Sequence, residues 1–97
     1  MTPANANQVC ERLLIVNERG LHARASAKFV NLVATMPESL KITVTKDGTD
    51  AAGGSILGLM MLGAARGDSI DICVSGEGAE AALEQLAELV RNGFGEN

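Results

Sequence analysis

The stretch LKITVTKDGTDAA, residues 40–52, sets the fold class. Its first half alternates apolar and polar side chains, the pattern of a β-strand with one face in the core and one in water. Asp47-Gly48 then predicts a tight hairpin turn, because glycine adopts positive φ without steric cost. The returning segment, residues 49–52, is short and weakly apolar, which suits the edge of a sheet. The stretch therefore predicts two antiparallel strands.

A strand and a helix are expected on the N-terminal side of this hairpin. Residues 12–17 (RLLIVN) are apolar and β-branched on both faces, which favours a central strand. From Leu21 to Met36, apolar residues recur at intervals of three and four, the spacing of an amphipathic helix. Pro37 ends this helix, because proline disfavours helical geometry in the residue before it.

A helix, a strand and a second helix are expected on the C-terminal side. Residues 56–62 are apolar nearly all round, and Ser55 precedes them as a natural N-cap. Residues 69–75 alternate again and predict a fourth strand. Between Gly78 and Gly93, an apolar stripe opposite a row of glutamates predicts the last helix, with the second glycine as its C-cap.

The predicted element order is β-α-β-β-α-β-α, which places the chain in the α+β class. Antiparallel strands with helices gathered on one side give an open-faced β-sandwich, a four-stranded antiparallel sheet covered on one face by three helices. Residues 1–9 are expected to form a mobile N-terminal tail. Residues 10–97 are expected to form a single small domain.

Composition narrows the classes of function. The formal net charge of −4 disfavours nucleic acid as a partner, because a phosphate backbone needs clustered Lys and Arg. The chain has no Trp or Tyr and two Phe, so it has almost nothing for base stacking. No apolar run approaches the roughly 20 residues of a membrane helix, so no membrane insertion is expected. Without the pattern of a secretory signal, we expect a cytoplasmic protein.

The two cysteines, Cys10 and Cys73, are far apart in the sequence and belong to no CxxC or Cys/His cluster. A zinc site needs several soft ligands at set spacings, and the chain has one histidine. No metal and no cofactor are therefore expected. We expect the cysteines to serve as small apolar side chains, buried or half-buried.

His22, the single histidine, opens the first predicted helix. Imidazole titrates near neutral pH, so part of it is neutral at pH 7 and can act as a nucleophile. Unpaired N–H groups at a helix N-terminus offer a place for an attached phosphate. Arg24 adds a planar guanidinium that matches phosphate oxygens. On these residues alone, a capping histidine beside a solvated arginine remains the simpler interpretation.

Gly53-Gly54-Ser55 begins the second predicted helix. Phosphorylation of Ser55 would place the added charge at a helix start, although an ordinary turn and cap is the simpler interpretation. A helix cannot bury all the apolar residues that follow on one side. Some of them are therefore expected on the surface, as a contact patch for a protein partner.

Two segments resemble the signatures of a known family. Residues 20–24 (GLHAR), followed by Phe29-Val30, resemble the phosphorylation-site signature of HPr, the histidine-containing phosphocarrier family of the phosphoenolpyruvate-dependent phosphotransferase system. Residues 55–60 (SILGLM) and Leu62-Gly63 resemble its second signature, around a regulatory serine. The resemblance runs from about Arg12 to Glu88 and implies the same open-faced fold.

The resemblance implies a stoichiometric phosphoryl carrier and not an enzyme with turnover of its own. His22 would take a phosphoryl group on Nδ1 from enzyme I, with help from Arg24, and pass it to A-type acceptor domains in sugar uptake or nitrogen-related regulation. Ser55 would be the site of the HPr kinase/phosphorylase. The protein is expected to be a monomer. The expected partner surface consists of Ala23, Ala27, Ile56, Leu57 and Met60.

One position departs from the family pattern. Many members have proline directly after the arginine, where this chain has Ala25, so its first helical turn lacks the restraint of a proline ring. The alternative function is a regulatory binding protein controlled by Ser55 phosphorylation, with no carrier role. A structural or small-ligand module is a third possibility. The presence of His22 together with Arg24 favours the carrier.

Overall fold

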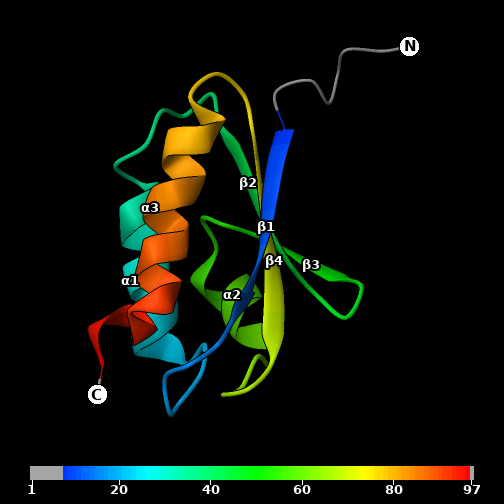
Figure 1. Ribbon diagram of the computed structural model, residues 1–97, viewed down its shortest axis with the longest axis vertical. Coiled ribbons are helices and arrows are strands. Elements are labelled where there is room, and N and C mark those ends of the chain that lie inside the picture. The colour runs from blue at the N-terminus through cyan, green and yellow to red at the C-terminus, as the bar shows by residue number, and fades with distance from the viewer. Residues whose placement is uncertain (1–7, 97) are drawn as a thin grey trace.

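A sheet and a set of helices form two layers in residues 8–96, the part of the chain that the computed structural model describes. The elements are β1 (Gln8–Leu14), α1 (Ala23–Val33), β2 (Lys41–Lys46), β3 (Thr49–Ala52), α2 (Ile56–Met61), β4 (Ser69–Ser75), α3 (Ala79–Arg91) and the 3₁₀ turn η2 (Gly93–Gly95). Figure 1 shows α1 and α3 side by side on one side of the sheet. The predicted α+β open-faced sandwich is confirmed. No helix within these residues has the length and apolar character needed to cross a membrane.

The Asp47-Gly48 hairpin forms as predicted. Both turn residues have positive φ, 50° and 84°, which is the backbone geometry of a type I′ turn. The sheet has the order β1-β4-β2-β3, and each neighbouring pair is antiparallel. The expectation that residues 49–52 form an edge strand is confirmed.

β1 lies at the other edge of the sheet, so the expectation of a central first strand is wrong. Apolar residues on both faces of residues 12–17 suggested burial on both faces. Leu14 is nevertheless 53% exposed, because the helices cover one face only. The strand begins at Gln8, so Gln8 and Val9 pair with β4 and belong to the sheet, not to the expected tail. The expectation of a tail at residues 1–7 lies outside the described residues.

α1 is shorter than the predicted helix from Leu21 to Met36. It begins at Ala23, with His22 as its N-cap, and ends at Val33. After Ala34, whose amide still bonds to Val30, the amides of Thr35 and Met36 bond to the third residue back and form a tighter turn before the proline. The other predicted strands and helices begin and end within two residues of the observed ones.

The core lies between the sheet and the helices. Its largest fully buried side chains come from every layer and from the C-terminal turn: Phe29, Phe94, Ile15, Leu59, Ile70, Ile72 and Leu86. Each large apolar side chain stabilises the fold by about 1.5–3 kcal/mol when it is fully buried. Along β4, buried residues alternate with more exposed ones, so the uncovered face of the sheet is largely polar.

Cys10 and Cys73 form a disulfide, which corrects the expectation of two apolar thiols. They are direct partners in the antiparallel register of β1 and β4. Cys10 is exposed and Cys73 half-buried, on the uncovered face of the sheet. The two cysteines are 63 residues apart, so the sequence alone does not predict their pairing. Only the strand register places the two side chains opposite each other.

Reduction of this disulfide is expected to lower the free energy of unfolding by up to about 4 kcal/mol. The bond closes a long loop and so restricts the unfolded chain. Urea unfolding of the oxidised protein with and without a dithiol reductant measures the difference. The double variant Cys10→Ser, Cys73→Ser is the control and should not respond to the reductant. Equal unfolding midpoints for the verified oxidised and reduced forms would contradict this prediction.

Candidate functional site

His22 is both the candidate nucleophile and the N-cap of α1. Its backbone is extended (φ −76°, ψ −175°), and its carbonyl accepts the first helical hydrogen bond, from the Ser26 amide at 2.9 Å. Its Nδ1 accepts from the Arg24 amide at 3.2 Å. This nitrogen therefore faces the N-terminus of the helix with its lone pair. The expected capping role of His22 is confirmed.

The opposite ring nitrogen of His22 faces Glu96. Nε2 lies 2.7 Å from Glu96 Oε2. Because Nδ1 already accepts an N–H, the two hydrogen bonds assign the proton to Nε2, which donates to the carboxylate. The His22 side chain is 20% exposed, so the ring is held on both sides yet open to a partner.

The loop before α1 fixes where the ring lies. Gly20 has φ +66°, and a Cβ there would lie 2.3 Å from the Ala64 carbonyl oxygen, so the loop lies directly on that backbone. The Leu21 amide donates to the same oxygen at 2.9 Å, and its side chain is buried. Asn17 is also buried and donates through Nδ2 to the Gly20 carbonyl at 2.8 Å. These contacts anchor the segment that carries His22.

The C-terminal turn η2 brings Glu96 to the site. Phe94 is 1% exposed and adopts positive φ (58°), so the chain turns back while the aromatic ring enters the core. Lys28 Nζ on α1 donates to the Phe94 carbonyl at 2.7 Å. Neither Glu96 nor Asn17 was expected from the sequence. The available signal was a phenylalanine between two glycines near the end of the chain, which indicates a segment folded back onto the core.

The electrostatics of Glu96 favour its ionised form. Burial raises the pKa of this carboxyl group, but hydrogen bonds from Asn17 and His22 and Coulombic attraction to His22 and Lys28 lower it by more. The net pKa of Glu96 therefore lies below its ordinary value of 4.5. The carboxylate beside His22 is thus charged at neutral pH.

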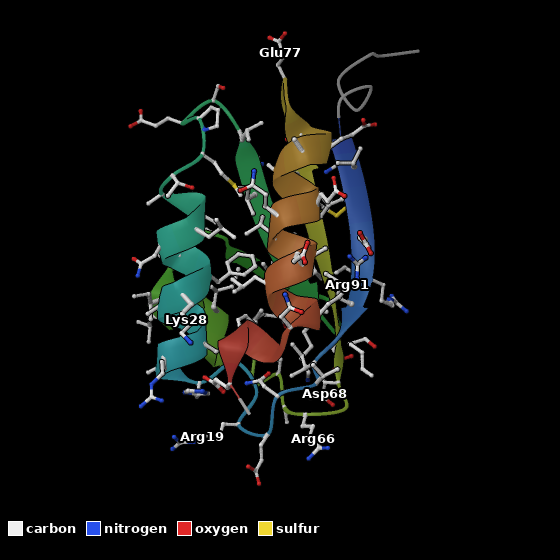
Figure 2. All side chains as sticks on the ribbon, turned by 60° about the vertical axis from the view of Figure 1, so that its left-hand side comes forward. Arg19, Lys28, Arg66, Asp68, Glu77 and Arg91 are labelled. Atoms are coloured by element: carbon white, nitrogen blue, oxygen red, sulfur yellow. A yellow bond between two sulfur atoms is a disulfide. The ribbon has the colours of Figure 1, made fainter. Side chains whose placement is uncertain are left out.

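Arg24, the second expected site residue, is exposed in the first turn of α1. It lines a hollow of about 260 Å³ together with Arg19, Lys28 and Glu96. Figure 2 shows Lys28 on α1 and Arg19 in the loop that leads to it. Three cationic and two acidic side chains, Glu18 and Glu96, therefore border the hollow beside the histidine, and the excess of positive charge suits an anionic group. Within residues 8–96, no cluster of three or more His, Cys, Asp or Glu residues is placed to hold a metal ion.

Ser55 is the N-cap of α2, as expected. Its backbone is extended (φ −115°, ψ 109°), and its Oγ accepts from the Gly58 amide at 2.9 Å. Gly58 also needs its small size, because a Cβ there would lie 3.0 Å from Ser55 Oγ. The hydroxyl is half-buried and already accepts a hydrogen bond from the Gly58 amide, so this geometry establishes its role as an N-cap.

Comparison with known proteins identifies the family of the chain. A family model described as the PTS HPr component phosphorylation site matches residues 9–92. The chain belongs to the HPr family. It is 40% identical over 82 residues to phosphocarrier protein HPr of Neisseria meningitidis (serogroup A), covering 84% of this chain and 90% of that protein. The structure called HPr-C-His from Thermoanaerobacter tengcongensis has a TM-score of 0.84 and 34% identity, covering 92% of this chain and 98% of the other.

A longer relative contains an HPr-like part. The chain is 34% identical over 84 residues to the multiphosphoryl transfer protein of Haemophilus influenzae, and the match covers 86% of this chain and 17% of that protein. Together with the family match, these relatives identify the chain as an HPr-type phosphocarrier of the phosphotransferase system.

In this HPr-family chain, α2 carries the exposed apolar patch that the sequence led us to expect. Leu59 is fully buried. The exposed apolar residues of the helix are Ile56 (40%), Leu57 (67%), Met60 (40%) and Met61 (74%). The last of these was not among the expected contact residues. Because α1 packs against α2, Ala23 (exposed) and Ala27 (half-buried) lie on the neighbouring helix.

The contribution of Glu96 to the free energy of unfolding is expected to change with pH in the acidic range. Because its pKa is lower in the folded protein than in the unfolded chain, its contribution is fully present above its ordinary pKa of 4.5. That contribution is lost as the pH falls through the folded value. Wild type should therefore be more stable than Glu96→Gln at pH 6, and the difference should shrink below pH 4.5.

Urea unfolding of both proteins from pH 3 to pH 7 measures this difference. Glu38→Gln, which removes one exposed carboxylate from the turn after α1, is the control for charge alone. A stability difference between wild type and Glu96→Gln that stays constant over the whole range would contradict the prediction.

Proposed function

We propose that this phosphocarrier accepts a phosphoryl group on Nδ1 of His22 from enzyme I and passes it to A-type acceptor domains, in sugar uptake or nitrogen-related regulation. The observation that carries the proposal is the orientation of the ring. Its Nδ1 lone pair faces the Arg24 amide at the start of α1, where amides lack partners within the helix, while its other nitrogen carries the proton.

The transfer step is a displacement at phosphorus. The Nδ1 lone pair attacks the phosphorus, the bond from phosphorus to the donor atom breaks, and its electron pair returns to the donor atom. The Arg24 amide, which now donates to Nδ1 at 3.2 Å, is freed when the N–P bond forms. That amide can then donate to a phosphoryl oxygen, and the Arg24 guanidinium adds positive charge nearby. The capping position therefore becomes an anion site.

His22→Ala is expected to abolish phosphoryl acceptance and to leave the fold intact. The variant loses an N-cap, which costs about 1 kcal/mol, but it leaves no core cavity because the side chain is partly exposed. Incubation with phosphoenolpyruvate and enzyme I, followed by detection of acid-labile phosphate, measures acceptance. Ser55→Ala is the control and should be labelled. Labelling of His22→Ala at the wild-type rate would refute the proposal.

Arg24→Ala is expected to slow phosphoryl transfer by about tenfold. The effect is smaller than the roughly 100-fold loss on removing a buried oxyanion donor, because solvent screens an exposed guanidinium. Arg24→Lys should recover part of the rate, since a point charge lacks the planar fork. Arg66→Ala, another exposed arginine, is the matched control. Equal rates for the Arg24 and Arg66 variants would show that Arg24 has no special role.

We also propose that Ser55 is a regulatory site for the HPr kinase/phosphorylase. The added phosphate oxygens can accept the Gly58 amide that Oγ now accepts, so α2 should stay folded. The same charge borders the exposed Ile56 and Leu57. A partner that docks on this patch would have to remove water from an unpaired phosphate, which is costly.

Phosphorylation of Ser55 is therefore expected to leave the melting temperature unchanged or higher, and to slow acceptance of phosphate by His22. Thermal unfolding and enzyme I-dependent labelling of the fully Ser55-phosphorylated protein measure the two effects. An unchanged labelling rate would leave Ser55 as a cap only. If the phosphorylated and unphosphorylated forms differ in partner binding while His22 is never labelled, the regulatory binding protein is the correct alternative.

A further inference from the structure

Glu96 contacts the ring nitrogen of His22 that does not take the phosphoryl group in the proposed transfer. We propose that Glu96 is a positioning residue, which holds the proton on Nε2 of His22 and so leaves the Nδ1 lone pair free for the incoming phosphorus. This inference rests on the proposed acceptance of phosphate by His22. Its geometric basis is the pair of opposed hydrogen bonds, 2.7 Å from Nε2 to Glu96 Oε2 and 3.2 Å from the Arg24 amide to Nδ1.

Only one neutral tautomer of His22 satisfies both hydrogen bonds. With the proton on Nε2, the ring donates to the carboxylate and accepts from the Arg24 amide. With the proton on Nδ1, two N–H groups would face each other at the helix start, and Nε2 and the carboxylate would be two facing acceptors. The carboxylate and the amide therefore select the same tautomer from opposite sides of the ring.

A buried amide orients the Glu96 carboxylate. Asn17 is 4% exposed, and its Nδ2 donates both to the Gly20 carbonyl at 2.8 Å and to Glu96 Oε1 at 3.1 Å. Both partners are acceptors, so this assignment uses the two N–H groups of the amide. The cost is that Asn17 Oδ1 has no partner within the described residues. Oε1 is thus held by Asn17, and Oε2 is directed at His22.

Glu96 is also mounted on a fixed turn. The buried Phe94 ring and the 2.7 Å hydrogen bond from Lys28 Nζ to the Phe94 carbonyl hold η2 against α1. Glu96 follows directly after the last residue of η2. A positioning group needs such support, because its benefit comes from geometry that exists before the reaction.

The carboxylate also matches the charge that the reaction creates. As the Nδ1–P bond forms, the ring becomes positively charged and shares that charge with Nε2–H, which Glu96 faces at 2.7 Å. A carboxylate on the second nitrogen stabilises such an imidazolium. In the outward step, the N–P bond breaks and its pair returns to Nδ1, which leaves the neutral ring with its proton still on Nε2. Glu96 therefore serves both directions of transfer.

Glu96→Gln tests this role at constant shape. A Gln amide has one acceptor and one NH₂ group, while both Asn17 and His22 present donors. If its oxygen faces Asn17, its NH₂ group opposes Nε2–H. If its oxygen faces His22, its NH₂ group opposes the amide of Asn17. The variant is therefore expected to raise the Nδ1–H fraction of the neutral ring and to slow phosphorylation by enzyme I about 10- to 100-fold.

The experiment combines imidazole ¹⁵N chemical shifts at a pH where the ring is neutral with labelling rates from phosphoenolpyruvate and enzyme I. Glu38→Gln is the matched control, since it removes one exposed carboxylate from the turn after α1, outside the hollow that Glu96 lines, and should change neither readout. Glu96→Asp should restore the wild-type tautomer preference at least in part. Amide NMR spectra check that each variant is folded.

The outcomes separate the two hypotheses. A wild-type protein that takes no phosphate refutes the proposed function. A wild-type protein that is labelled, with an unchanged tautomer and rate in folded Glu96→Gln, refutes the positioning role alone. A slower rate with an unchanged tautomer also refutes it, because the carboxylate would then act only through its charge. The expected result is a shift of both readouts in Glu96→Gln and of neither in Glu38→Gln.

Discussion

Burial of one face of a four-stranded sheet is the constraint on which the rest of the structure depends. The inward side chains of β4, including Ile72, meet Phe29 of α1 and Leu86 of α3, and all three are fully buried. Because one face is covered, α1 and α3 must lie side by side, and the chain after α3 must pass close to α1. The start of α1 and the end of the chain are thus brought together by packing alone.

That meeting point is where the proposed phosphoryl acceptor, His22, lies. A histidine at a helix start supplies a nucleophile next to unpaired amides, but a free imidazole divides its proton between two nitrogens. The C-terminal turn resolves this ambiguity, because Glu96 meets Nε2 while the Arg24 amide meets Nδ1. Burial of Phe94 provides the energy that keeps the turn in place. The core and the reacting atom are therefore linked through a few residues at the end of the chain.

The uncovered face of the sheet has a different character. Its edge strand β1 is tied to β4 through Cys10 and Cys73 in addition to the backbone ladder. Disulfides are rare in reducing compartments, and Cys10 is exposed to solvent. The segment that follows β1 carries Asn17, which orients Glu96. The disulfide-linked edge strand and the residue that orients Glu96 are thus only a few residues apart along the chain.

Local patterns in the sequence determined most of the fold and half of the site. Alternation in residues 40–52, the positive-φ hairpin at Asp47-Gly48 and the N-caps at His22 and Ser55 depend on neighbours a few residues away, so they could be predicted. Only the tertiary structure placed β1 at an edge, joined Cys10 to Cys73 and brought Glu96 to the histidine. These features depend on which strand registers and helix faces minimise exposed apolar surface over the whole chain, and no window of neighbouring residues contains that information.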